Sequence, residues 1–398
     1  MKFCFWAGEI AGALNGNTIG GGELQTALLA KSLVKAGHEV VVIDPFTNDS
    51  LTTADGIKII HVPNWNKGLP ITRLFFYQLP SLHKLLVEQN ADFYYVRTRS
   101  YFHLLSYWAA RKTGGKFILA IASDIDILSL RKIFKYRDKQ SFNLFKYLRL
   151  DLPNNIVFKY VLKRADYITL QHTGQRIKST LLKGKQSIFP NIFDYSVVKE
   201  SQKRNGDYFI SAGSLTMVKG AGNLLELLKK LSKETKVMIV GEPRCRKTRK
   251  IYEQLRMMKN VELKGRLRHE ETIKLIGNAK ALINTSNFEG FPNIFLEAWA
   301  QGVPVISLKV NPGNVIENYG LGKDCKGDIQ KMKEYIEQDV TAGIDRTSLM
   351  YYVRLNHSFQ FASQRFLNIL NNTDIPLSKV HHAHSFFHRL FSRRRKRA

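Results

Sequence analysis

The chain has 398 residues, which exceeds one average hydrophobic core and favours two domains. Although 44% of the residues are hydrophobic, no apolar run approaches the ~20 residues of a spanning helix, which excludes a membrane-spanning protein. The 61 Lys and Arg outnumber the 33 Asp and Glu, so the net charge of +28 favours a polyanionic partner. Three scattered cysteines and the lack of a long apolar signal core predict a cytosolic protein with reduced thiols.

Short β-rich runs alternate with amphipathic helical patterns along the chain. In the first half the expected strands are 40–43, 59–62, 93–96, 117–120 and 167–170, and the clearest expected helices are 24–36 and 102–112. In the second half the expected strands are 208–211, 237–240, 261–264, 281–284 and 303–306, and the expected helices are 221–232, 250–258, 269–278 and 292–301. Such alternation predicts an α/β protein with doubly wound parallel sheets.

The two series of elements join near Phe189-Pro190-Asn191, so we expect two Rossmann-like domains at 1–192 and 193–355. A helix at 356–372 is expected to pack back toward the first domain, and a basic tail follows at 373–398. Two such domains face each other across a cleft, and parallel sheets bind ligands at the carboxyl ends of their strands. The residues that directly follow the strands are therefore the candidate site.

A glycine-rich stretch follows the first apolar run. Gly8, Gly12 and Gly16 precede Gly20-Gly21-Gly22-Glu23, which opens the helix expected at Leu24. Glycines let the backbone approach a ligand closely, and a helix N-terminus attracts phosphate. The spacing does not fit Gly-x-Gly-x-x-Gly directly after a strand, which disfavours a nicotinamide dehydrogenase. A flexible surface loop is the alternative interpretation.

In the second half, Lys219-Gly220 stands just before the expected helix at 221–232. A lysine at that place could bring one ammonium group to a diphosphate. Surface Lys-Gly pairs are common, so this pair alone is a weak signal.

Two acids, Glu289 and Glu297, are separated by seven residues. Pro292 suits the first turn of a helix, so we expect Glu289 on the preceding loop, facing the cleft, and Glu297 about a turn and a half into the helix. Two such carboxylates could hold hydroxyls at two points of an elongated ligand, with its phosphates at the helix start between them. A solvated loop acid and a helix-face acid are the alternative.

Several segments together resemble the signatures of retaining glycosyltransferases of family 4. They are Gly20-Gly21-Gly22-Glu23, 36–42, Lys219-Gly220, 240–243, 289–293, Glu297-Ala298 and 302–305. The resemblance covers about residues 1–370, and the block with the two glutamates is its most specific part. It implies the GT-B fold, with the acceptor mainly in the first domain and a nucleotide-sugar donor mainly in the second.

The resemblance also implies roles for single residues. Glu289 would contact the donor sugar near the reacting centre, and Glu297 would bind the ribose hydroxyls. Lys219 would neutralise the diphosphate. The other donor-binding candidates are Gly21 and Gly22, closing on the diphosphate from the first domain, Gly265 and Arg266 near the base, and Gly290, Phe291, Pro292 and Asn293, whose backbone N–H groups would lie near the sugar and diphosphate.

At one position the sequence departs from the family. The family usually has an arginine after the glycine at Gly213, and this chain has Ser214. One of two cations on the leaving diphosphate is then missing, which would slow transfer because the developing charge must be offset. Arg244, Arg246 and Lys247 are candidates to replace it.

The mechanism implied by the resemblance needs no metal and no cofactor besides the donor. The nucleotide diphosphate leaves while the acceptor hydroxyl attacks the same face of the sugar. Asp124-Ile125-Asp126 has the spacing of a metal motif but lies in the acceptor half. We therefore consider Asp124 as an acceptor-side candidate, with helix capping as the alternative.

Two segments interleave basic residues with large apolar ones, namely 131–149 and 379–397. Apolar rings beside dense positive charge suit an anionic membrane surface. A solvated charged face and a disordered tail are the alternatives, and no nucleic-acid-binding module is visible. We therefore expect a peripheral protein at the cytoplasmic face of the membrane.

The leading hypothesis is a hexosyltransferase-type retaining glycosyltransferase. It would move a sugar from a UDP- or GDP-linked donor to a glycan or lipid-linked acceptor in cell-surface polysaccharide, lipopolysaccharide or glycolipid biosynthesis. One alternative is a nucleotide-sugar epimerase of the same fold. Another is a non-catalytic basic membrane-binding protein on a glycosyltransferase scaffold, which Ser214 motivates and the presence of both glutamates disfavours.

Overall fold

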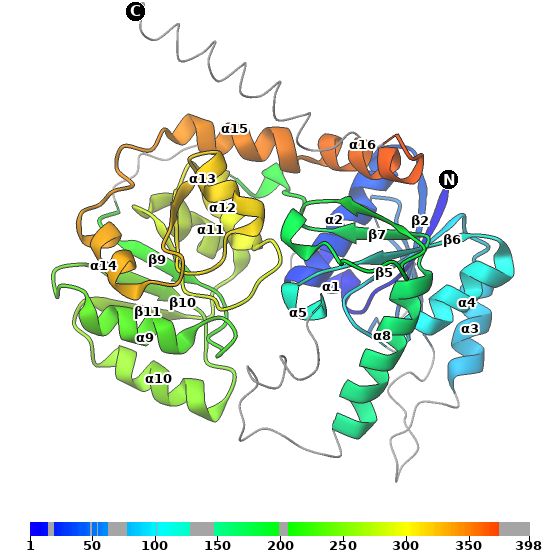
Figure 1. Ribbon diagram of the computed structural model, residues 1–398, viewed down its shortest axis with the longest axis horizontal. Coiled ribbons are helices and arrows are strands. Elements are labelled where there is room, and N and C mark those ends of the chain that lie inside the picture. Colours follow the sequence, from blue (N-terminus) through cyan, green and yellow to red (C-terminus); the bar gives the residue numbers. More distant parts are fainter. Residues whose placement is uncertain are drawn as a thin grey trace, which may run out of the picture.

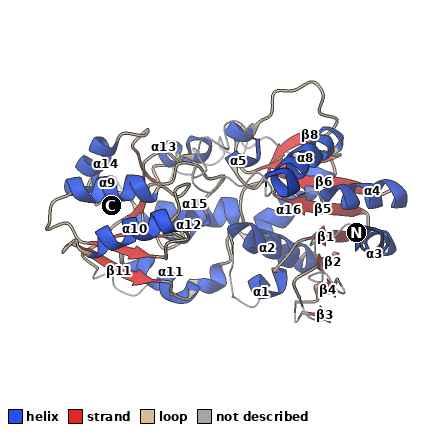
Figure 2. Cartoon of the chain, turned by 90° about the horizontal axis from the view of Figure 1, so that it is seen from below, coloured by secondary structure: helices blue, strands red, loops and turns tan. Residues whose placement is uncertain are grey.

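The computed structural model describes residues 1–14, 20–47, 50–53, 55–62, 78–100, 102–127, 147–198 and 206–373. Within these ranges the chain forms two α/β domains side by side along the long axis (Figures 1 and 2). Gly16, residues 131–146 of the first basic segment and the whole segment 379–397 lie outside the described residues.

The first domain is built on an eight-stranded sheet. In spatial order its strands are β3 (Leu51–Thr52), β4 (Lys58–His61), β2 (Glu39–Asp44), β1 (Lys2–Trp6), β5 (Phe93–Arg97), β6 (Lys116–Ala120), β7 (Tyr167–Leu170) and β8 (Lys185–Ile188). Only the β3–β4 pair is antiparallel among these strands. The central strand β1 pairs with β2 on one side and β5 on the other, so the order of strands reverses there.

Helices cover both faces of this sheet because its central strands are apolar on both sides. The helices of this domain are α1 (Ile10–Leu14), α2 (Gly21–Lys35), α3 (Leu79–Glu88), α4 (His103–Thr113), α5 (Asp124–Ile127) and α8 (Leu152–Arg164). One buried cluster joins α1 and α2 to the sheet, and a second joins α3, α4 and α8 to the opposite face (Figure 1).

The start of α2 differs from the expectation. The helix begins at Gly21, three residues before Leu24, so Gly21 and Gly22 are helical. In the first turn of a helix the N–H groups have no intrahelical partner, so glycine costs less there than in the interior. The acidic Glu23 in the same turn also favours helix, because it complements the positive end of the dipole.

The second domain has a six-stranded parallel sheet. In spatial order its strands are β11 (Val261–Gly265), β10 (Val237–Val240), β9 (Phe209–Ala212), β12 (Leu282–Asn284), β13 (Val305–Ser307) and β14 (Gly322–Asp324). Its helices are α9 (Ala221–Lys230), α10 (Arg246–Arg256), α11 (His269–Asn278), α12 (Asn293–Trp299), α13 (Val315–Asn318), α14 (Ile329–Glu337) and α15 (Arg346–His357). Helix α10 begins four residues earlier than expected, where Cys245 and Thr248 form a capping box.

The last described helix, α16 (Phe359–Leu370), returns to the first domain (Figure 1). It follows α15, whose Leu349 and Val353 are buried in the second domain. Phe366 of α16 is fully buried, and its ring lies 5.1 Å from the ring of Phe189 and 6.2 Å from that of Phe3. Because α16 is part of the core of the first domain, the chain connects the two domains twice.

We predict that Phe366→Ala lowers the free energy of unfolding of the first domain by about 3 to 5 kcal/mol, because it removes a fully buried ring. Urea unfolding measures the loss. The matched control is Gln360→Ala, an exposed position on the same helix, which should change it by less than about 0.5 kcal/mol. Equal effects of the two substitutions would contradict a core role for α16.

Candidate active site

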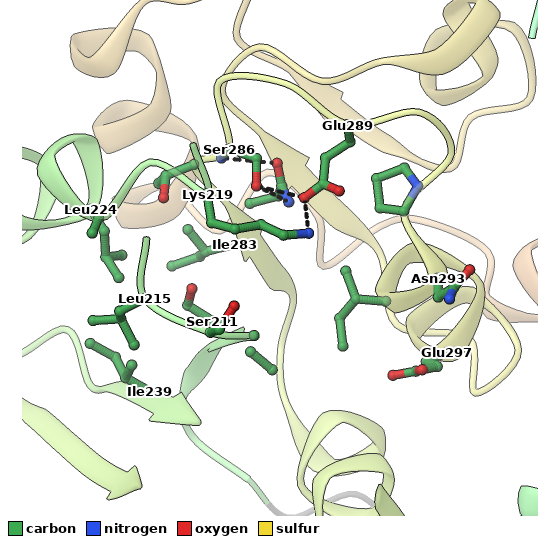
Figure 3. Close-up of a pocket in the computed structure, with 18 residues that line it drawn as sticks. Ser211, Leu215, Lys219, Leu224, Ile239, Ile283, Ser286, Glu289, Asn293 and Glu297 are labelled. Carbon is green, nitrogen blue, oxygen red and sulfur yellow. Dashed lines mark hydrogen bonds and ion pairs between the residues drawn. The ribbon is translucent and has the colours of Figure 1, made fainter. Parts of the chain in front are cut away.

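A pocket opens at the carboxyl edge of the second sheet, where β9 and β12 lie side by side and the strand order reverses (Figure 3). Its walls are the ends of these strands and the start of α12. The polar and charged residues that line it are Ser211, Ser214, Lys219, Asn284, Thr285, Ser286, Glu289, Asn293 and Glu297. This is the position at which open parallel sheets bind their ligands.

Glu289 lies on the loop after β12 and points into the pocket toward Lys219, with which it forms an ion pair (Figure 3). The hydroxyl of Ser286 donates a second hydrogen bond to the same carboxylate, at 2.9 Å. The Glu289 side chain is only 13% exposed, so the ion pair offsets the desolvation cost of a largely buried carboxylate. Among the described residues both partners contact Oε1, which leaves Oε2 available to a ligand.

The residue after Lys219 explains how the ammonium reaches Glu289. Gly220 has φ +72, and a Cβ there would lie 1.8 Å from the carbonyl oxygen of Thr285. Only glycine permits this approach, which brings the start of α9 against the end of β12. Gly220 is therefore a structural requirement of the pocket wall, and the two-residue pattern alone could not reveal this.

Glu297 lies on α12, with its side chain 9% exposed. Its Oε1 is 3.1 Å from Nε2 of His269, the first residue of α11. The hydrogen bond and negative charge of Glu297 raise the pKa of His269 above its ordinary value, against the opposing effect of burial. The sequence analysis missed His269, although it follows β11 at the same sheet edge and heads the expected helix.

The loop 290–293 joins the two domains. The N–H of Phe291 donates to Oε1 of Gln171 at 3.0 Å, and Nδ2 of Asn191 donates to the Phe291 carbonyl at 2.6 Å. At Gly290 a Cβ would lie 1.7 Å from Oε1 of Gln171, so only glycine fits. The Phe291 ring is buried in the core of the second domain, and its N–H is bonded to the first domain.

Asn293 forms hydrogen bonds with α2 of the first domain. Its Nδ2 donates to the Gly21 carbonyl at 3.3 Å, and its Oδ1 accepts from Gln25 and Asn191 at 3.1 and 2.7 Å. The structure therefore brings Gly21 of the first domain against Asn293 of the second. Of the residues in this network, the sequence analysis placed Asn191 at the domain junction but gave it no role, and it missed Gln25 and Gln171.

Asp124 begins α5 and lies outside the residues that line the pocket. Its Oδ1 accepts hydrogen bonds from His172 and Gln175, each at 2.9 Å. The backbone N–H groups near this helix, those of Ala122 and Ser123, are instead bound by Asp126. The hydroxyl of Ser123 accepts from the N–H of Ile125 at 3.3 Å, so Ser123 caps the helix start, and Asp124 belongs instead to a polar cluster with His172.

Gly265 and Arg266 stand at the end of β11 and do not line the pocket. The Gly265 carbonyl accepts from the N–H of Gly241 at 2.7 Å, and Arg266 is exposed. Within the described ranges, no group of three or more His, Cys, Asp or Glu side chains is arranged to hold a metal ion. None of the described helices is both long and apolar enough to cross a membrane.

Comparison with protein families matches two parts of the chain. Residues 19–169 match the family described as Glycosyltransferase Family 4, and residues 196–354 match Glycosyl transferases group 1. A curated relative, an uncharacterized glycosyltransferase of Methanocaldococcus jannaschii, is 28% identical over 222 residues. That match covers 49% of this chain and 54% of the relative, so the chain spans about half the length of the relative.

Several solved structures share the fold over nearly the whole chain. Sucrose-phosphate synthase from Thermosynechococcus elongatus has a TM-score of 0.70 at 14% identity, covering 94% of this chain and 98% of that one. Anabaena HepE in complex with UDP-glucose has a TM-score of 0.64 at 15% identity, covering 94% and 100%. WaaG, a glycosyltransferase involved in lipopolysaccharide biosynthesis, has a TM-score of 0.63 at 16% identity, covering 92% and 98%.

These neighbours are GT-B proteins, so the expected fold is confirmed. At such low identities they establish the fold and nothing finer. The two family matches divide the chain in the same way as its two sheets. The protein is therefore a GT-B protein with a family 4-type glycosyltransferase domain in its first half and a group 1 glycosyltransferase domain in its second.

Proposed function

We propose that the protein is a retaining, hexosyltransferase-type enzyme. It moves a sugar from a UDP- or GDP-linked donor to a glycan or lipid-linked acceptor in cell-surface polysaccharide, lipopolysaccharide or glycolipid biosynthesis. The observation that carries the proposal is the pair Glu289 and Glu297, which line one pocket and are each held by a cationic or protonatable partner. The UDP-glucose complex of HepE and the described role of WaaG support the donor and acceptor classes.

In this proposal Lys219 changes partner when the donor binds. Its ammonium forms an ion pair with Glu289, and the donor diphosphate offers it a stronger anionic partner. Lys219 then offsets the charge that develops on the leaving diphosphate, while Glu289, still held by Ser286, faces the sugar carbon. The acceptor hydroxyl attacks the face from which the diphosphate departs, and its proton passes to a departing phosphate oxygen. No protein-bound metal takes part in this proposal.

Glu297 has a different role in the proposal. Its buried carboxylate is fixed by His269 through Oε1, and Oε2 accepts the ribose hydroxyls of the donor. A carboxylate held on one side loses little rotamer freedom when the ligand binds. His269 is thus a positioning residue for the nucleotide half of the donor.

We further propose action at the cytoplasmic face of a membrane, with segments 131–149 and 379–397 on anionic lipid. The support for this is the net charge of +28 and the mixture of rings and cations in both segments. The acceptor would lie in the first domain near Asp124. No nucleic-acid partner is proposed.

The activity is tested by incubating the full chain with UDP- and GDP-sugars, with and without membrane lipid extract. We expect release of UDP or GDP together with sugar transfer only when acceptor is present. Sugar interconversion without acceptor would identify an epimerase. Anion binding without any turnover would identify a non-catalytic binding protein.

We predict that Glu289→Ala lowers kcat about 1000-fold, because it removes a charge aimed at the reacting centre. Glu297→Ala should raise the donor KM about tenfold with kcat nearly unchanged, because it removes one charged hydrogen bond. Steady-state kinetics distinguish the two effects. Glu253→Ala, an exposed acid on α10, is the control and should behave as the parent. Full activity in both site variants would refute the site assignment.

Ser214 provides a second test, because it lines the pocket beside the partly neutralised Lys219. We predict that Ser214→Arg raises kcat/KM about five- to tenfold by adding a cation near the diphosphate. Ser214→Ala, which adds no charge, should stay within about twofold of the parent. A loss of activity in a folded Ser214→Arg variant would show that the pocket already holds its full cation complement.

The His269–Glu297 pair predicts a pH dependence of stability. The pKa of His269 is raised above 6.5 in the folded protein. The pair therefore contributes fully to the free energy of unfolding below pH 6.5, and this contribution disappears as the pH rises through the raised pKa. Below pH 6.5 the free energy of unfolding of the parent should exceed that of His269→Gln by about 1 kcal/mol. At pH values above the raised pKa the two free energies should be equal. Urea unfolding at several pH values measures this difference.

His38 is the control for this experiment, because burial and the nearby N-terminal charge lower its pKa. The difference between the parent and His38→Gln should therefore change with pH in the opposite direction. A His269→Gln difference that stays constant with pH would contradict a charged His269.

A further inference from the structure

A stripe of exposed side chains runs along α8 on the first domain. Ile156 and Tyr160 are four residues apart, as are Lys159 and Lys163, and all four residues are exposed, which places them on one side of the helix. The opposite side of α8, with Phe158 and Val161, is buried against the sheet. Ile156, on the outer side of the helix, is 57% exposed, so the stripe combines an apolar side chain with two lysines.

Neighbouring elements extend the stripe into a face. The rings of Tyr107 on α4 and Tyr160 on α8 meet edge to face at 6.0 Å, and the next residue, Trp108, is 46% exposed. The N–H of Lys183 donates to the Lys163 carbonyl at 3.2 Å, which ties the loop bearing Leu181, 63% exposed, to the end of α8. We call Trp108, Ile156, Lys159, Tyr160, Lys163 and Leu181 the α4–α8 face.

The charge around this face is positive. Exposed cations flank it at Arg111 and Lys112, one turn after Trp108 on α4, and at Lys183, whose N–H is bonded to the end of α8. The nearby acid Asp166 is already ion-paired with Arg111. Lys159 and Lys163 themselves have no acidic partner within the described part of the chain, so their charges are available to an anionic surface.

The chemistry of the face decides between its anionic partners. Nucleic acid would use planar rings and cations, but Ile156 and Leu181 gain nothing by stacking on bases. A bilayer surface uses every member: aliphatic side chains enter the acyl boundary, Trp and Tyr favour the interface, and lysines reach anionic headgroups. Long lysine side chains on one helix side can lie along the apolar groups while their ammonium groups stay in water.

We propose that the α4–α8 face docks the first domain on an anionic lipid bilayer. Ile156, Leu181 and Trp108 enter the interface, and Lys159 and Lys163 contact the headgroups. The inference builds on the proposed action at a membrane, but it assigns the contact to folded helices of the acceptor-side domain, separate from segments 131–149 and 379–397.

The test measures binding of the full chain to vesicles of phosphatidylcholine with phosphatidylglycerol, compared with phosphatidylcholine alone. We expect Ile156→Ser combined with Leu181→Ser, and separately Lys159→Glu combined with Lys163→Glu, each to weaken binding to the anionic vesicles about tenfold. The parent should bind phosphatidylcholine alone weakly, and added salt should weaken its binding to the anionic vesicles.

Matched controls come from the second domain. Met257 is exposed on that domain, so Met257→Ser tests the loss of an exposed apolar side chain elsewhere. Lys233→Glu combined with Lys259→Glu reverses the same number of exposed charges as the lysine pair. Both controls should retain parental vesicle binding. Because all substituted residues are exposed, circular dichroism should remain unchanged throughout.

The fluorescence of Trp108 reports lipid contact at the α4–α8 face itself, separately from contact at segments 131–149 and 379–397. In vesicles containing brominated lipid, we expect tryptophan fluorescence of the parent to be quenched, and the Trp108→Phe variant to lose that share of the quenching. Equal quenching, or vesicle binding by both face variants at the parental level, would overturn the proposal. The proposal would also be overturned if the face variants bound duplex DNA more weakly than the parent, or changed from dimer to monomer, while their vesicle binding stayed the same.

The vesicle assay contains neither donor nor acceptor, so its outcome is independent of the proposed transfer reaction. Conversely, the face variants should retain parental turnover on a water-soluble acceptor. A protein that binds vesicles through this face but transfers no sugar would refute the proposed function alone.

Discussion

The geometry of the protein depends on the side chain of Asn191, at the junction of the two domains. Its amide nitrogen donates to the Phe291 carbonyl and to Asn293, and its Oδ1 accepts from Gln171 and Arg97. Buried amides of this kind cost free energy unless they are satisfied, so this arrangement exists only while both domains are in contact. Its backbone carbonyl is also 2.6 Å from His357, whose pKa burial lowers to about 4.

This junction makes the loop before α12 serve two purposes. The Glu289 carboxylate faces the pocket, while the N–H of Phe291 and the side chain of Asn293 are hydrogen-bonded to the first domain. Any rotation of the domains must therefore break buried hydrogen bonds at the loop that carries Glu289. The position of the Glu289 carboxylate and the contact between the domains thus depend on the same few residues.

The sequence predicted most strands because parallel strands buried on both faces appear as nearly continuous apolar runs, as in 237–240 and 117–120. It did not predict the central strand β1 or the edge strands β3, β8 and β14. It predicted the location of Glu289 and Glu297 because Pro292 and the adjacent strand fix the local geometry. It failed at the start of α2, where glycine suggested a loop and the unpaired first turn of a helix tolerated it. It also missed Gln25, Gln171 and His269, because their partners lie far away in the sequence and no local pattern marks a long-range hydrogen bond.

The large positive charge belongs mainly to the surface and little to the pocket. Within the pocket, Lys219 is balanced by Glu289, and Glu297 is balanced by a protonatable histidine. In the proposed function, a donor diphosphate would compete with Glu289 for Lys219, so hydroxyl contacts would have to supply part of the donor affinity. On the α4–α8 face, by contrast, Lys159 and Lys163 stand beside apolar side chains and form no ion pair with an acid of the described ranges. Lysine is therefore paired with an acid in the pocket and, within the described residues, unpaired on the α4–α8 face. The net charge of +28 describes the surface of the protein more than its pocket.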